Sequence, residues 1–232
     1  MSEQRVRFEI SERMARLTFD RPGDGNRIDV ATMQGFIAAL RQANDAEVDV
    51  LVIAAAGPDF SLGRDQSEKP TGMSKRDNLG LILQANELLA GFAGVTVAAI
   101  QGRALGFGSG VAVQSDITIA AEDAVMGFNE IQHGFAPAIV MTYLETYVSR
   151  KVAIDLLMSG RNVTAPEARA MGLVTRVVAE NNLEAEVQST VDDLLSKPIQ
   201  ALRQCKFFLR IVATVPESER GQQALDALTA GT

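Results

Sequence analysis

A glycine-rich turn between two apolar runs constrains the fold of this chain more than any other feature. It lies in the stretch Thr96–Ala121, TVAAIQGRALGFGSGVAVQSDITIAA, where four glycines fall within nine residues: Gly102, Gly106, Gly108 and Gly110. The flanking runs are too apolar for a surface linker, so the stretch predicts a buried strand, a tight turn, the start of a helix and a second buried strand. Glycines in such a turn let the backbone approach a ligand and leave N–H groups free to point at it.

Alternating strand and helix signals predict an α/β fold with a largely parallel sheet, because consecutive strand–helix–strand units are right-handed crossovers. Strands are expected at Val6–Ile10, Ala15–Phe19, Val50–Ala56, Val95–Ile100 and Asp116–Ala120, and helices at Val30–Ala43, with Asp29 as N-cap, and Lys75–Leu89. The later pattern predicts helices at Ala138–Tyr147, Lys151–Met158 and Pro166–Met171, a short strand at Leu173–Val178 and two terminal helices.

Composition narrows the functional classes. The chain has 232 residues, 47% of them hydrophobic, which is enough for one substantial core. A net charge of −7 without a basic block argues against nucleic-acid binding. The single cysteine, Cys205, and the single histidine, His133, leave no disulfide pair and no paired metal ligands. With no long apolar run, these features predict a cytoplasmic protein without a metal site that binds neither nucleic acid nor membrane.

Two phosphate-binding interpretations of the glycine turn fit poorly. A P-loop requires GxxxxGK, and no lysine lies between Lys75 and Lys151. A dinucleotide fingerprint requires GxGxxG and a later acidic residue beyond a full helix and strand, whereas these glycines are spaced two apart and Glu130 follows no such helix. A purely structural role in strand–helix packing stays open.

A second glycine turn favours the interpretation that the two turns together form an oxyanion hole. The segment FSLGRD, Phe60–Asp65, also follows a buried strand and places Gly63 before Arg64. Neighbouring parallel strands end at the same edge of a sheet, where such folds bind ligands. Two turns there can each direct one backbone N–H at a single carbonyl oxygen and stabilise the charge that develops on it.

Three segments in order resemble the crotonase family, the enoyl-CoA hydratases and isomerases: FSLGRD, IQGRALGFGSGVAVQSDITIAAEDAVMGFNEI and GRNVTAPEARAMGLVTRVV. The resemblance runs from about residue 5 to about residue 212. It implies a spiral of ββα units over residues 1–180 and a helical C-terminal region over residues 181–232, shorter than in the family. It also implies homotrimers or hexamers, a place in fatty acid metabolism and acyl-CoA substrates, with coenzyme A as part of the substrate and no separate cofactor.

The resemblance also assigns catalytic roles. The backbone N–H groups of Arg64 and Phe107 would form the oxyanion hole. The family usually has glycine in place of Phe107, so its ring is expected to narrow the pocket, unless it is simply a core aromatic. Glu130 matches one of the two glutamates of the hydratases, and Gly110 stands where the other would be. The alternative for Glu130 is a surface or turn-capping acid.

One carboxylate suffices to move a proton from the α carbon of a 3-enoyl-CoA to its γ carbon, so the sequence predicts a single-glutamate enoyl-CoA isomerase. The alternatives are a hydratase whose water is held by His133, Asn129 or backbone, a decarboxylase or thioester hydrolase, and a catalytically degenerate acyl-CoA-binding protein.

The remaining predicted site residues surround this centre. His133 is a candidate partner of Glu130, Arg27 is a candidate phosphate contact, and Asp65 is expected to cap a helix entered after FSLGRD. Ser109, Asn129 and Tyr143 are candidate lining residues whose direction the sequence does not fix. The predicted substrate-binding set is Arg27, Ser61, Leu62, Gly63, Asp65, Gly106, Gly110 and His133.

Overall fold

Two sheets organise the computed structural model, which describes residues 5–212 and 214–229. The larger sheet has the strand order β1-β2-β3-β4-β6-β9, with β1 antiparallel to β2 and every other neighbouring pair parallel. Its strands are β1 (Val6–Ser11), β2 (Met14–Phe19), β3 (Val50–Ala55), β4 (Val95–Ile100), β6 (Ile117–Ala121) and β9 (Arg176–Val178). The smaller sheet consists of β5 (Arg103–Leu105), β7 (Val125–Gly127) and β8 (Asn162–Thr164).

The predicted spiral of ββα units is confirmed. After β4 in the large sheet the chain enters β5 in the small sheet, forms α3 (Phe107–Gln114), and repeats the path through β6 and β7. The strand β5 was not predicted. It has three residues inside the glycine-rich stretch and pairs with β7, so only tertiary contact reveals it.

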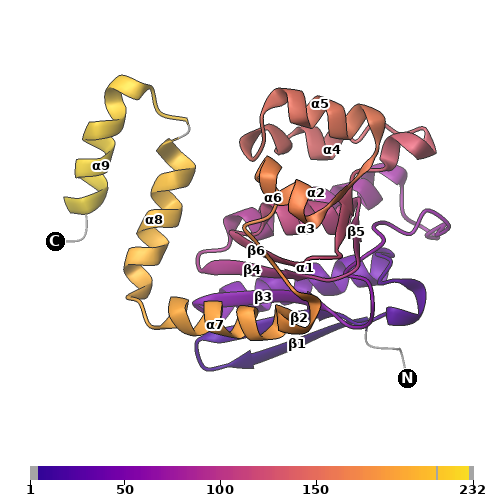
Figure 1. Ribbon diagram of the computed structural model, residues 1–232, viewed down its shortest axis with the longest axis horizontal. Coiled ribbons are helices and arrows are strands. Elements are labelled where there is room, and N and C mark those ends of the chain that lie inside the picture. The colour runs from indigo at the N-terminus through magenta and orange to yellow at the C-terminus, as the bar shows by residue number, and fades with distance from the viewer. Residues whose placement is uncertain (1–4, 213, 230–232) are drawn as a thin grey trace.

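The helices before the glycine turn agree with the sequence pattern. The Asp29 carboxylate accepts a hydrogen bond of 2.7 Å from the Thr32 N–H at the start of α1 (Val30–Asp45), as expected for its N-cap. Ser74 caps α2 (Lys75–Gly91) in the same way. Figure 1 shows α1, α2 and α3 on one side of the large sheet, which buries the apolar stripes of α1 and the whole of α3.

The region after β7 departs from the predicted helix Ala138–Tyr147. The helix α4 (Ala138–Met141) is followed by a separate 3-10 turn, η3 (Leu144–Thr146). Tyr143 has φ −132°, which is outside the helical region and ends the run. The expected strand Leu173–Val178 is also shorter, because only Arg176–Val178 pairs with β6. The helices α5 (Arg150–Ser159) and α6 (Ala165–Met171) lie close to their predicted positions.

The described residues after 180 form three α-helices instead of the expected two. α7 (Leu183–Leu195) packs against the large sheet, and α8 (Ile199–Val212) and α9 (Arg220–Thr229) form a hairpin that stands away from the body (Figure 1). The Lys206 ammonium donates to the carbonyl of Gly94 and to Asp116, at 2.8 and 2.7 Å. The division at residue 180 stays a prediction.

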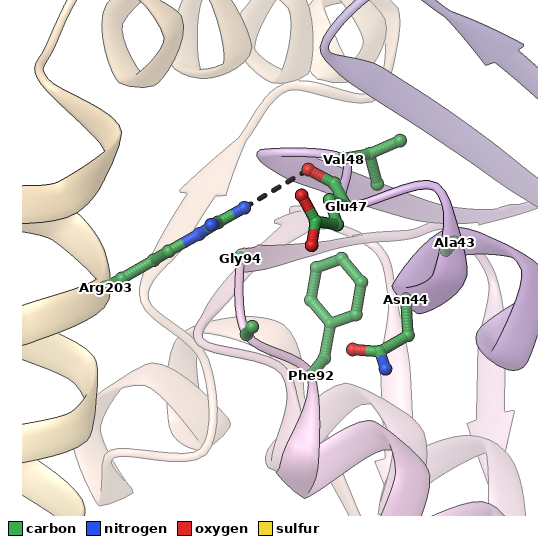
Figure 2. Close-up of a pocket in the computed structure, with 8 residues that line it drawn as sticks. Ala43, Asn44, Glu47, Val48, Phe92, Gly94 and Arg203 are labelled. Atoms are coloured by element: carbon green, nitrogen blue, oxygen red, sulfur yellow. Dashed lines mark hydrogen bonds between the residues drawn. The ribbon is translucent and has the colours of Figure 1, made fainter.

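A small cavity of about 200 Å³ lies where α8 meets the body (Figure 2). Arg203 reaches from α8 toward this cavity and donates to the Glu47 carbonyl at 3.1 Å. Phe92 also lines this cavity. Among the described residues, no helix is long and apolar enough to cross a membrane.

Candidate active site

A cavity of about 680 Å³ gathers nearly all the predicted site residues. It is bounded by the FSLGRD loop, the glycine turn, one face of α2 and the segment from Asn129 to Tyr143. The predicted residues that line it are Arg27, Leu62, Gly63, Arg64, Asp65, Gly106, Phe107, Glu130 and His133. Ser61 and Gly110 are buried and are not among the residues that line it, so their role as substrate-binding residues stays a prediction.

Ser61 instead holds the FSLGRD loop in shape. Its hydroxyl donates to the Asn26 carbonyl at 2.8 Å and accepts from the Gly63 N–H at 3.1 Å. The Asn26 side chain in turn donates to the carbonyls of Ala56 and Asp59, both at 2.8 Å. A fully hydrogen-bonded polar group under the loop fixes its backbone, as a buried network must.

The two glycine turns are packed backbone against backbone. A Cβ on Gly63 would lie 2.8 Å from the Leu105 carbonyl oxygen, and a Cβ on Gly108 would lie 2.9 Å from the Ser61 Cβ. Gly106 has φ +51°, a conformation that favours glycine. These glycines therefore let the loops approach each other, so the packing role that the sequence left open is real and also positions the site.

Two backbone N–H groups are free at this junction. The Asp65 N–H donates to the Ile28 carbonyl, and the Ile28 N–H donates to the Gly63 carbonyl. Arg64 lies between these two bonded residues, so its own N–H points away from the Ile28 backbone. Within the described part of the chain, no backbone acceptor engages the Arg64 N–H. Phe107 is the first residue of α3, where an N–H has no acceptor within its own helix. The structure thus supplies two donors beside one cavity.

The Phe107 ring behaves as a core aromatic. Its side chain packs edge-on against Phe36 of α1, with the ring centroids 5.8 Å apart and an interplanar angle of 89°. Phe107 is 7% exposed and still lines the cavity. The ring thus packs in the core while the residue borders the cavity, and a narrowing of the pocket by the ring stays a prediction.

Glu130 presents a half-buried carboxylate to the cavity. It begins the 3-10 helix η2 (Glu130–His133), and its Oε2 is buried without a hydrogen-bond partner among the described residues. Burial raises the pKa of Glu130, and a hydrogen bond from its own backbone N–H and the smaller effect of the nearby His133 oppose this only in part. A partly buried carboxylate facing a cavity with a raised pKa is suited to proton transfer, and its burial argues against a surface acid.

The raised pKa makes a prediction about stability. Because folding favours the protonated form of Glu130, its ionisation costs folding free energy above its folded-state pKa. Below the pKa of Glu130 in the unfolded chain this cost disappears. The free energy of unfolding therefore decreases as pH rises from the unfolded-state pKa to the folded-state pKa of Glu130. Glu130→Gln is therefore expected to unfold at a higher temperature than the wild type at pH 7, with the difference vanishing near pH 4. Thermal scans at both pH values measure this, and a lower unfolding temperature of the variant at pH 7 would contradict it.

Gly110 lies next to the Tyr143 hydroxyl. A Cβ on Gly110 would lie 2.6 Å from the Tyr143 hydroxyl oxygen, closer than any real Cβ contact. Tyr143 and Asn129 both line the cavity, whereas the Ser109 hydroxyl is used within the fold, donating to the Ala104 carbonyl and accepting from the Gly127 N–H. Of the three candidate lining residues, Asn129 and Tyr143 thus face the cavity, and Ser109 does not line it.

Charged side chains surround the outer part of the cavity. The positive charges of Arg27 and Arg21 and two hydrogen bonds from Ser67 hold the pKa of Asp65 below its usual value, with the Ser67 hydroxyl as the largest cause. Asp65 therefore caps a turn, and the expected helix after FSLGRD is wrong because α2 begins only at Lys75.

The wall formed by α2 was missed from the sequence. Asn78, Ile82 and Asn86 line the cavity, and Asn78 accepts a hydrogen bond of 2.5 Å from the Arg64 guanidinium. Their spacing of four residues places them on one helix face. That spacing in the sequence predicts that the three residues share one face of α2. Which face of the helix is turned toward the cavity depends on how the helix packs in the fold.

The fold and the site define an α/β protein that offers two free backbone N–H groups and a buried carboxylate to one ligand cavity. The family model described as "Enoyl-CoA hydratase/isomerase" matches residues 9–229, and the chain belongs to this family. The expected resemblance is thereby confirmed.

Individual relatives agree. A "Probable enoyl-CoA hydratase" of Rhizobium meliloti is 32% identical over 209 residues, covering 89% of this chain and 81% of the relative. A "Putative enoyl-CoA hydratase" of Thermus thermophilus is 31% identical over 182 residues, covering 75% and 72%.

Solved structures share the fold. An enoyl-CoA hydratase of Mycobacterium smegmatis has a TM-score of 0.92 at 24% identity, over 99% of this chain and 91% of that one. A putative enoyl-CoA hydratase of Thermobifida fusca in complex with CoA has a TM-score of 0.87 at 28% identity, over 97% and 92%.

Proposed function

We propose that this protein isomerises 3-enoyl-CoA thioesters to 2-enoyl-CoA thioesters, with Glu130 as its single base. One observation carries the proposal: the Oε2 of Glu130 is buried at the cavity without a hydrogen-bond partner among the described residues, while the position of Gly110 holds no carboxylate. The other lining carboxylates are engaged, since Asp65 accepts from Ser67 and Glu68 accepts from the Val30 N–H at 2.9 Å.

The reaction needs two steps. Ionised Glu130 removes a proton from the α carbon, and the electron pair moves through the thioester carbonyl to its oxygen. The N–H groups of Arg64 and Phe107 stabilise that negative charge as an oxyanion hole. The dienolate then takes the proton back from Glu130 at its γ carbon, which forms the conjugated 2-enoyl product and restores the carboxylate.

Binding of coenzyme A is supported by the Thermobifida fusca neighbour, whose structure contains CoA. Arg27 is the proposed phosphate contact, since it lines the cavity and its guanidinium can form charge-assisted hydrogen bonds with a phosphate. Loss of a charge-assisted hydrogen bond reduces affinity about tenfold.

Arg27→Ala is therefore expected to raise the Kd for CoA about tenfold and to leave kcat within about threefold. Calorimetry with CoA and steady-state kinetics measure the two effects. Arg41→Ala on the exposed side of α1 is the control. An unchanged Kd in Arg27→Ala would remove Arg27 from the site.

Conversion of 3-hexenoyl-CoA, followed by the absorbance of the conjugated product, tests the proposed function. Isomerisation by the wild type that Glu130→Ala reduces to background supports it, and equal rates for the two proteins would refute it.

Hydration is the second candidate, favoured by the polar residues Asn129 and His133. Both line the cavity together with Glu130, and polar groups there can hold a water molecule between them. Crotonyl-CoA loses its conjugated absorbance on hydration, so that substrate separates the two reactions. A faster turnover of crotonyl-CoA than of 3-hexenoyl-CoA would favour hydration.

A further inference from the structure

The Tyr143 hydroxyl occupies the space where a side chain on residue 110 would begin. It lies 2.6 Å from the Cβ position of Gly110, whereas the ring carbon Cζ, to which it is attached, lies 3.8 Å away. An approach of 3.8 Å is ordinary van der Waals contact, so the hydroxyl alone creates the conflict. Gly110 and Tyr143 are therefore coupled through one atom.

Glu130 reaches the same helix at a neighbouring position. Its Oε1 lies 3.4 Å from the Cβ position of Gly106, and the Gly110 N–H donates to the Gly106 carbonyl at 3.0 Å. That bond separates the two glycines by one helical turn, about 5.4 Å. Glu130 and Tyr143 thus approach one face of α3 about one turn apart, and both line the cavity.

The phenol and the carboxylate differ in protonation. Burial, and then the negative charge of Glu130, raise the pKa of Tyr143 far above the range of any assay. The hydroxyl therefore keeps its proton and acts as a donor, not as a base. No hydrogen bond found among the described residues engages this hydroxyl, which leaves it free to contact a bound acyl group.

We propose that Tyr143 is a specificity-determining residue: its hydroxyl takes the place of a side chain at residue 110 and leaves Glu130 as the group that exchanges a proton with the acyl chain. This inference rests on the proposed function. Addition of water requires one group that takes a proton from the water and a second that delivers a proton to the α carbon, and a phenol that keeps its proton supplies neither. The pair Gly110–Tyr143 therefore favours isomerisation over hydration.

The role of the hydroxyl is tested with Tyr143→Phe, which keeps the ring. Isomerisation is expected to slow by about two- to tenfold, the size of one neutral hydrogen bond, with an unchanged pH profile. A loss of more than about 100-fold, or a shifted pH profile, would show that the phenol itself transfers a proton and would overturn the proposal.

The contact between the two residues is tested by a double-mutant cycle of unfolding temperature. Gly110→Ala alone is expected to lower the unfolding temperature by about 3 to 8 °C, because its Cβ meets the hydroxyl. In Tyr143→Phe the same substitution is expected to cost less than about 2 °C. Gly80→Ala in α2, whose Cβ would have nothing within 4 Å, is the control and should behave alike in both backgrounds. Additive shifts for Gly110→Ala would overturn the steric claim.

The effect on specificity is tested by installing a carboxylate. In Gly110→Glu/Tyr143→Ala, the ratio of crotonyl-CoA hydration to 3-hexenoyl-CoA isomerisation is expected to rise at least about tenfold above that of Tyr143→Ala. The same ratio in a double variant that still binds CoA would overturn the proposal. If the wild type isomerises no 3-enoyl-CoA, the proposed function fails, while the unfolding cycle still reports whether residues 110 and 143 are coupled.

Discussion

Replacing Glu130 with glutamine is expected to lower kcat for 3-hexenoyl-CoA by about 100- to 10,000-fold, the usual contribution of a general acid–base group. The amide preserves the size of the side chain and cannot accept the α proton. Because the proposed partner of Glu130 is the acyl group and not the coenzyme A moiety, the Kd for CoA should change by less than about threefold. Stopped-flow or steady-state absorbance measures kcat, and calorimetry measures the Kd.

Glu122→Gln is the matched control, since Glu122 is an exposed carboxylate before β7 that does not line the cavity. It should retain the wild-type rate. A Glu130→Gln variant that loses less than about tenfold in kcat would mean that another group takes the proton.

The pH dependence of the same reaction follows from the pKa of Glu130. Isomerisation requires the ionised form, so kcat/KM, which reports the free enzyme, falls as pH decreases through this pKa. Burial raises the pKa, and the acidic limb of the profile therefore lies above the ordinary range of a glutamate.

Removing the N–H of Phe107 is expected to have the second largest effect. Proline fits the first position of a helix, and Phe107 occupies that position in α3, so Phe107→Pro deletes the donor with little change in backbone. One oxyanion-hole donor contributes about 100- to 1,000-fold to the rate. Phe107→Pro should therefore lose that factor in kcat relative to Phe107→Leu.

Phe107→Leu is the necessary control because both variants lose the ring that packs against Phe36, and only one loses the N–H. Circular dichroism and CoA binding verify that both are folded. Equal kcat values for the two variants would remove the Phe107 N–H from the oxyanion hole.

Much of this fold could be predicted from local sequence patterns. The apolar runs of β3 and β4 and the periodicity of α1 with its Asp29 cap are visible in the chain itself. The helix after Pro137 was misjudged because apolar spacing continues through Tyr143, while the backbone turns there. The spacing of apolar residues predicts which residues are buried. It does not predict that the helix ends before Tyr143, whose side chain lines the cavity.

The sequence by itself determined the α/β class, the two glycine turns and the presence of a glutamate without a second carboxylate at Gly110. These features depend on residue type and spacing, which the chain displays directly. Only the tertiary structure decided that Ser61 supports the loop from beneath, that one face of α2 closes the cavity, and that the Tyr143 hydroxyl fills the space above Gly110. Such contacts join residues distant in sequence, and their geometry is set by the packing of whole elements.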